Sequence, residues 1–139
     1  MVQLIVGKKG KGKTSHLLDK VNSEVKEISG NIVFLDKNTK HMYDLNNKVR
    51  LIDVSQFMID SDREFLGFVS GIISQDHDVQ QIYFDNFLKI ACLEGQDIRP
   101  AAAKLEKLSQ KFDVSFILSV SMDEAEVPEE LKDKIIVSL

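Results

Sequence analysis

The chain has 139 residues, of which 43% are hydrophobic and 29% charged, with a formal net charge of −4 at pH 7. These values are typical of one globular domain, and the acidic balance gives no strong signal for nucleic-acid binding. The single cysteine, Cys92, excludes an intramolecular disulfide and a cysteine-rich zinc site, and no apolar run approaches the roughly 18 residues of a membrane-spanning helix.

Short apolar runs rich in β-branched residues predict buried strands. They occupy residues 2–6, 31–36, 81–85, 114–121 and 134–139, and residues 49–55 are a weaker candidate for a further, shorter strand. Apolar positions at helical spacing predict helices that run from the first strand to Gly30, over residues 60–74 and over residues 98–112, with a short helix at 87–93. Ser61 or Asp60 is the expected N-cap of the helix over 60–74, and Pro100 fits the first turn of the helix over 98–112.

Strands that are apolar on both faces and alternate with amphipathic helices indicate an α/β fold. We expect residues 1–139 to form a single domain with a mainly parallel sheet of about five strands and helices on both faces. The first apolar run, residues 2–6, is too short for a signal peptide. A reduced, cytoplasmic protein without membrane association is therefore expected, with Cys92 as a small buried hydrophobe.

The segment GKKGKGKT lies between the first predicted strand and the first predicted helix, and it matches the pattern G-x-x-x-x-G-K-[ST]. Glycines let the backbone point successive N–H groups at phosphate oxygens, and the following helix adds its positive end. Lys13 is expected to neutralise the β- and γ-phosphates, and the Thr14 hydroxyl to ligate Mg²⁺. The predicted nucleotide-binding residues are Gly7, Lys8, Lys9, Gly10, Lys11, Gly12, Lys13, Thr14 and Ser15.

Two buried strands end in an aspartate. Asp85 follows the apolar run of residues 81–84, which is the natural position for a second acidic group that helps Thr14 to hold the metal. Asp36 ends the run NIVFLD in the same way. Three interpretations of Asp36 are open: it takes the metal-holding position in place of Asp85, it acts as a base that polarises a water molecule, or it is a plain strand-end residue. The three histidines, His16, His41 and His77, show no metal-ligand spacing and are expected at the solvated surface.

With GKKGKGKT and IYFDNF the chain resembles the P-loop NTPases, particularly their RecA-like branch. The resemblance covers most of the chain and implies a three-layer fold, ATP as ligand or substrate, and Mg²⁺-dependent ATPase activity. It implies that the strand at 114–121 lies between the first strand and the strand that ends at Asp85. It also implies a γ-phosphate sensor at Ser119 or Ser121, and it makes Asp36 a candidate general base beside Lys13 and Asp85.

The chain departs from this family where many members carry a catalytic Glu, because Asn86 follows Asp85. Asparagine can orient a water molecule but cannot accept its proton near neutral pH. A nucleotide-dependent switch or assembly subunit with little hydrolysis is therefore the alternative prediction. Lys8 stands where ParA/MinD-type ATPases carry a signature lysine, but Lys9 replaces their glycine and the chain is much shorter.

A small-molecule kinase is a further alternative, and it would need arginines on a lid that closes over the phosphates. Only three arginines are present, Arg50, Arg63 and Arg99, which argues against a kinase. No N-K-x-D motif for guanine recognition occurs, so ATP is favoured over GTP. The expected macromolecular partner is another protein or a second copy of the chain.

Overall fold

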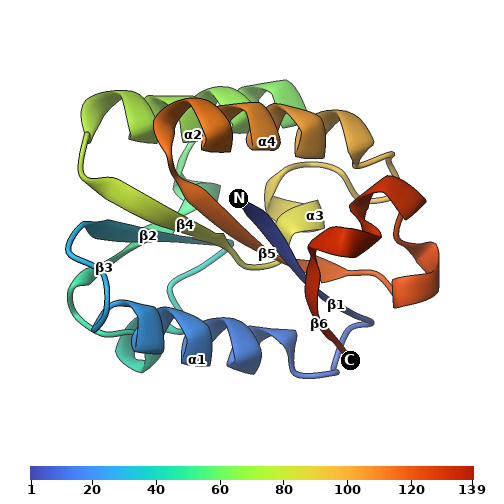
Figure 1. The fold of residues 1–139 in the computed structure, drawn as a ribbon, viewed down its shortest axis with the longest axis horizontal. Coiled ribbons are helices and arrows are strands. Elements are labelled where there is room, and N and C mark those ends of the chain that lie inside the picture. Colours follow the sequence, from blue (N-terminus) through green and yellow to red (C-terminus); the bar gives the residue numbers. More distant parts are fainter.

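A six-stranded sheet forms the centre of the structure, a computed structural model that describes residues 1–139 (Figure 1). The strand order is β3-β2-β4-β5-β1-β6, and every pair of neighbouring strands is parallel. The strands are β1 (Val2–Gly7), β2 (Asn31–Asp36), β3 (Val49–Asp53), β4 (Val79–Phe84), β5 (Ser115–Ser121) and β6 (Ile135–Ser138). The predicted α/β class and parallel sheet are therefore confirmed.

Helices cover both faces of the sheet: α1 lies below it in Figure 1, and α2 and α4 lie side by side above it. The α-helices are α1 (Lys13–Glu24), α2 (Asp62–Gln75), α3 (Phe87–Ile90) and α4 (Arg99–Phe112). Short 3₁₀ segments complete the connections at Met42–Asp44, Val54–Gln56, Glu124–Glu126 and Glu129–Lys134. None of these helices has the length and apolar character that crossing a membrane requires.

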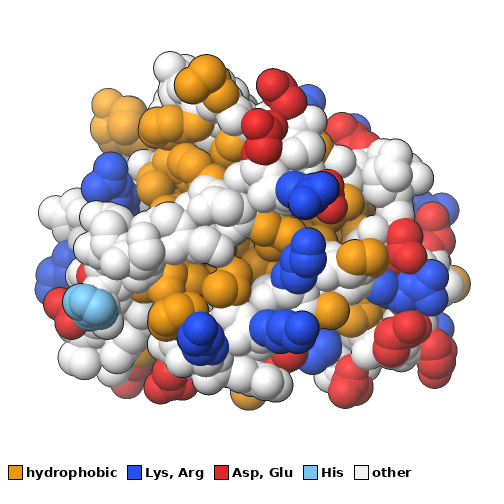
Figure 2. All heavy atoms as spheres, turned by 90° about the horizontal axis from the view of Figure 1, so that it is seen from above, with side chains coloured by type: hydrophobic (Ala, Val, Ile, Leu, Met, Phe, Trp, Pro, Cys, Tyr) orange, Lys and Arg blue, Asp and Glu red, His pale blue; other side chains and the backbone are white.

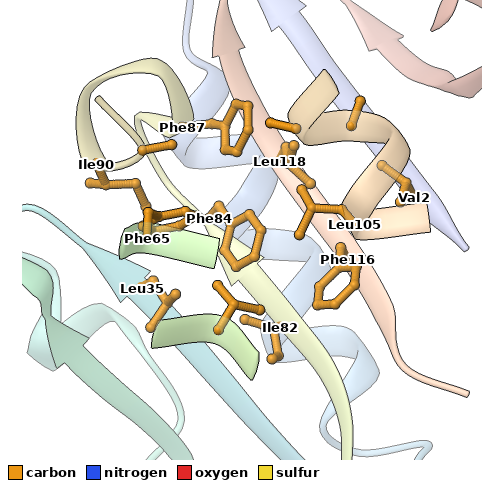
Figure 3. Packing of buried hydrophobic residues seen from close by; sticks show 14 of the residues in the cluster. Val2, Leu35, Phe65, Ile82, Phe84, Phe87, Ile90, Leu105, Phe116 and Leu118 are labelled. Atoms are coloured by element: carbon orange, nitrogen blue, oxygen red, sulfur yellow. The ribbon is translucent and has the colours of Figure 1, made fainter. Parts of the chain in front are cut away.

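The strands are apolar on both sides because each contributes to two cores. Leu4 and Val6 of β1 belong to a core of 28 buried residues that includes side chains of α2 and α4, whereas Ile5 belongs to a core of eight on the α1 side. In the larger core the Phe84 ring lies 5.6 Å from Phe116 and 5.5 Å from Phe65, measured between ring centroids (Figure 3). This packing fixes the end of β4, so the residue that follows, Asp85, has a defined position.

The strand order confirms one expectation that came from the family resemblance. β5 lies between β1 and β4, so Ser119 stands next to both the glycine-rich loop after β1 and Asp85 after β4. In a parallel sheet all strands end at the same edge, and side chains that follow different strands can meet there. The connection from β1 to α1 lies at this edge, on the right of Figure 1.

Several local predictions were wrong. The sheet has six strands and not about five, because the weakly apolar segment at Val49 does form the edge strand β3. Helix α1 ends at Glu24 and not near Gly30, and a Cβ atom at Gly30 would lie 2.4 Å from the carbonyl oxygen of Asp78. Cys92 is exposed rather than buried, since the chain turns there with a φ of 59°.

Other local predictions are confirmed. Ser61 caps α2, and its hydroxyl oxygen accepts a hydrogen bond of 3.1 Å from the backbone N–H of Glu64. Pro100 occupies the first turn of α4, where its missing N–H costs no helical hydrogen bond. The short helix predicted from the run FLKIACL is α3, whose four residues follow Asn86 directly.

Candidate functional site

The loop between β1 and α1 turns sharply through two glycines. Gly10 has a φ of 82° and Gly12 a φ of 93°, which lie in the left-handed region that other residues rarely adopt. A Cβ atom at either position would meet no atom within 4 Å, so the backbone conformation and not space selects glycine here. The conformation leaves the N-terminus of α1 open toward the edge of the sheet.

The N-terminus of α1 has no internal acceptor for its free N–H groups. Gly12 precedes the helix and supplies no side-chain cap, and the first turn contains no acidic residue. The helix runs for 12 residues, so its dipole places partial positive charge at this end. An uncapped helix start without a carboxylate is suited to binding an anion.

Lys13, the first residue of α1, folds back over the loop. Its Nζ donates a hydrogen bond of 3.1 Å to the carbonyl oxygen of Lys8, and only 8% of the residue is exposed. Burial lowers the pKa of the Lys13 ammonium group, the carboxylate of Asp85 opposes this shift, and the charge of Lys9 adds to it. The ammonium group is thus a partly desolvated cation held close to the loop backbone.

Thr14, Asp85 and Ser119 form a hydrogen-bonded group that joins three elements. The hydroxyl oxygen of Thr14 lies 3.1 Å from each carboxylate oxygen of Asp85. Ser119 donates from Oγ to the same carboxylate at 2.7 Å, and the backbone N–H of Asn86 lies within bonding distance of both Asp85 and Ser119. Asp85 and Ser119 are 2% and 1% exposed, so their geometry is fixed by the surrounding protein.

Asp36 is a buried carboxyl group with an unsatisfied oxygen. Its Oδ1 accepts a hydrogen bond of 2.7 Å from the backbone N–H of Lys37, whereas its Oδ2 is buried without any partner. Burial is the main reason that the pKa of Asp36 rises to about 6 from its ordinary value of 3.8, and the negative charge of Asp85 adds to the rise. The raised pKa means that the protonated form of Asp36 is favoured more than in an exposed aspartate.

His41 lies close to Asp36 and Asp85, a position that was not predicted from the sequence. One ligand atom each from Asp36, His41 and Asp85 lie within 4.8 Å of one another, so together they could hold a metal ion. His41 is half-buried, and its Nδ1 lies 3.1 Å from Oδ2 of Asp44. The expected solvated position is therefore wrong for this histidine, while His16 and His77 are exposed as expected.

The predicted residues surround a cleft of about 320 Å³ that has no hydrophobic side chain in its lining. Nine of its eleven lining residues were predicted site residues: Lys9, Gly10, Gly12, Lys13, Thr14, Ser15, Asp85, Ser119 and Ser121. Lys37 and Asn86 complete the lining without having been assigned to it from sequence.

Four predicted residues lie outside this lining. Gly7 is buried at the end of β1, where its N–H donates to the carbonyl of Met122 at 2.8 Å, and Lys11 is exposed at the loop tip. Lys8 contributes its carbonyl to Lys13 and lines a neighbouring cleft, and Asp36 lies beneath the surface. The loop therefore acts partly through its backbone, and not every lysine in it faces the cleft.

The largest hollow of the surface lies elsewhere. It has a volume of about 590 Å³ and contains no predicted site residue. Half of its lining residues are hydrophobic and come mainly from β2, β3 and α2, while Arg50 of β3 and Lys48 just before β3 are among the polar ones. Figure 2 shows a broad hydrophobic area on the face that carries α2 and α4. We assign the functional site to the smaller polar cleft because its ionisable groups and helix terminus converge there.

Comparisons with known proteins add no family assignment: the chain matches no protein-family model and no curated protein.

Proposed function

We propose that the chain binds ATP with Mg²⁺ in the polar cleft and acts as an ATPase of the RecA-like P-loop type. One observation carries the proposal: Lys13, the uncapped start of α1 and the Thr14–Asp85 pair all face one cleft without apolar lining. A triphosphate is a highly charged ligand that needs cations and backbone N–H groups rather than apolar walls.

The arrangement of the sheet supports the finer fold assignment, a three-layer P-loop NTPase fold. β5 lies between β1 and β4, and α1 covers one face while α2 and α4 cover the other. This is the strand order that the RecA-like resemblance implies for the loop strand and the aspartate strand. The glycine-rich loop and Asp85 lie at the carboxyl edge of the parallel sheet, where open α/β sheets bind their ligands.

The residues present fit a magnesium ion. Mg²⁺ prefers hard oxygen donors, and the Thr14 hydroxyl and the Asp85 carboxylate supply two of them within 3.1 Å of each other. Thr14 and Asp85 would hold the ion, and Ser119 would keep the Asp85 carboxylate in place through its 2.7 Å hydrogen bond. When bound, Mg²⁺ would reduce the negative charge on the phosphate oxygens that it contacts.

The chain's own residues would act mainly by positioning and by charge. Lys13 and the N–H groups at the start of α1 would bind the phosphate oxygens, and they are already held in place before any ligand arrives. Hydrolysis then requires a water oxygen to attack the γ-phosphorus as the bond to the β-phosphate oxygen breaks. Asp36 is the candidate to accept the proton of that water, since a carboxyl with a pKa of about 6 can act as a base near neutral pH.

One observation favours the alternative, a nucleotide-dependent switch with little hydrolysis. Asp36 does not line the cleft, and its Oδ2 is buried, so a water molecule in the cleft does not reach the proposed base in this conformation. Asn86 lines the cleft but offers no basic group. Turnover would therefore depend on a movement of β2's end, which a partner or a second copy of the chain could supply.

The experiment is a calorimetric titration of the full chain with ATP in the presence of Mg²⁺, followed by measurement of phosphate release. Lys13→Ala should weaken ATP binding by about tenfold or more, because a partly buried cation that contacts phosphate is lost. Lys26→Ala is the matched control, since Lys26 is exposed beyond the end of α1 and forms no ion pair.

Two outcomes separate the candidate functions. Binding with phosphate release that disappears in Lys13→Ala supports an ATPase, whereas binding without release supports the switch. If ATP does not bind to the unaltered chain at millimolar concentration, both candidates are wrong.

A further inference from the structure

A second cleft adjoins the proposed nucleotide cleft and is dominated by lysines. It has a volume of about 430 Å³ and is lined by Lys8, Lys9, Lys37 and Lys89. The two clefts share Lys9 and Lys37, together with Asn86 and Ser121, so they are parts of one continuous hollow at the carboxyl edge of the sheet. Lys8 and Lys89 face only the second cleft of these two.

The four lysines come from different parts of the chain. Lys8 and Lys9 belong to the glycine-rich loop, Lys37 follows β2, and Lys89 lies in the short helix α3. Three of them are exposed and Lys37 is half-buried. Because the chain carries a net charge of −4, their meeting at one cleft is a local reversal of the overall charge.

None of the four ammonium groups is neutralised by an ion pair. Elsewhere in the structure Lys20, Lys132 and Lys134 each form an ion pair with a glutamate, but no carboxylate pairs with a lysine of this cleft. The cleft does contain two carboxylates, those of Glu94 and Glu126. Four lysines therefore face two glutamates, and the lining carries an excess of positive charge.

We propose that this second cleft binds a small anionic ligand, one that carries a phosphate or carboxylate group, beside the nucleotide. The proposal rests on the proposed function only in placing the ligand next to a nucleotide. The lysines could bind an anion whether or not a nucleotide is present. Four cations around a hollow of about 430 Å³ attract an anion. A bound anion also offsets the electrostatic repulsion between the lysine ammonium groups.

The dimensions and lining favour a small molecule over a polymer. Leu88 is the only hydrophobic residue of the lining, so the cleft offers no apolar anchor for a protein partner and no aromatic ring for stacking a base. The chain carries a net charge of −4, which does not favour a polyanion as the ligand. A compact anion with a polar body matches both properties.

The test is an NMR titration of the full chain saturated with Mg²⁺ and ADP, with inorganic phosphate in one arm and succinate in the other. Backbone amide signals of Lys89 and Gly95, which line the second cleft and not the nucleotide cleft, should shift saturably at anion concentrations of about 1–10 mM. Comparison of the two arms separates a phosphate ligand from a carboxylate ligand.

Two variants should move the affinity in opposite directions. Lys89→Glu should weaken anion binding by about tenfold, because it replaces an attraction by a repulsion, and Glu94→Gln should strengthen it by about two- to threefold. Neither residue lines the nucleotide cleft, so the affinity for ADP should change much less than the affinity for the anion. Lys104→Glu, an equal charge change on the exposed surface of α4, should leave anion binding unaltered.

The outcomes distinguish this proposal from the nucleotide proposal. Absence of saturable shifts with either anion, or equal shifts in Lys89→Glu and the unaltered chain, overturns the second site. If ADP does not bind, the same titration is run without it, and shifts at Lys89 and Gly95 that Lys89→Glu removes would still support the anion site while the nucleotide function fails.

Discussion

The Thr14 hydroxyl lies at the same distance, 3.1 Å, from both carboxylate oxygens of Asp85, although 71 residues separate the two in the chain. A hydroxyl has one proton, so Thr14 can donate to only one of these oxygens at a time. Ser119 and the N–H of Asn86 donate to Asp85 as well. The carboxylate is thus held by three neighbours around the position where the metal is proposed.

Removing the Thr14 hydroxyl should abolish most of the metal dependence of ATP binding. We expect Thr14→Val, which keeps the side-chain shape, to weaken binding of ATP with Mg²⁺ by about tenfold or more. Thr14→Ser keeps the hydroxyl and should bind nearly as well as the unaltered chain. The measurement is calorimetry with Mg²⁺ and with a chelator, and a Thr14→Val variant that retains the full metal effect would contradict the assignment.

Gly12 should not tolerate a side chain, although there is space for one. Gly12→Ala forces an L-residue to a φ of 93° and should destabilise the fold by about 1–2 kcal/mol while weakening nucleotide binding. Gly67→Ala is the matched control in α2, where a Cβ also meets no atom within 4 Å but no left-handed φ occurs. That variant should be more stable by about 0.5–1 kcal/mol in urea unfolding.

The stability of the chain should depend on Asp36 in a defined pH range. The pKa of Asp36 is about 6 in the folded protein and 3.8 ordinarily, so the folded state binds the proton more tightly. This stabilising effect is complete below the lower value and is lost as the pH rises through the higher one.

Asp36→Asn removes this titration. At pH 7 the variant should be more stable than the unaltered chain by on the order of 1–3 kcal/mol, and the difference should disappear near pH 4. Urea unfolding at several pH values between about 4 and 7 measures both curves. A difference that stays constant with pH would show that Asp36 does not titrate in this range.

Ser119 and Ser121 should behave differently when replaced. Ser119 is buried and hydrogen-bonded to Asp85, so Ser119→Ala should cost about 1–2 kcal/mol of stability by leaving buried groups without a partner. Ser121 lines the cleft, and Ser121→Ala should change stability by no more than about 0.5 kcal/mol. If Ser121 senses the γ-phosphate, its variant should lose preference for ATP over ADP in parallel titrations.

The sequence was most informative where one short pattern determines local geometry. The glycine positions, Lys13 and Thr14 could be predicted because a strand, a tight loop and a helix start follow one another directly. Asp85 was found because it ends an apolar run, and the same rule found Asp36. These predictions depend on neighbours in the chain and need no knowledge of the tertiary structure.

The positions of Lys37, His41 and Lys89 could not be predicted in the same way. Lys37 and His41 lie after β2 in a polar segment with no hydrophobic period. His41 comes near Asp85 because β2 and β4 are neighbours in the sheet, so the segments that follow these two strands lie close together. In the sequence, Lys89 looks like an ordinary exposed helix residue. In the folded protein it lines a cleft together with Lys8 and Lys9 of the loop after β1, because the sheet places α3 beside that loop. Such meetings depend on strand order, which periodicity does not encode.

The central place of β5 has a consequence for how the protein is made. β5 pairs with β1 from Val2 onward and with β4, and it comes late in the chain. A nascent chain on the ribosome can form helices α1 and α2 early, but β1 and β4 cannot be bridged until residues 115–121 have left the exit tunnel. During synthesis the cleft therefore cannot be complete before β5 has emerged, and shorter nascent chains contain the loop sequence without a complete binding site.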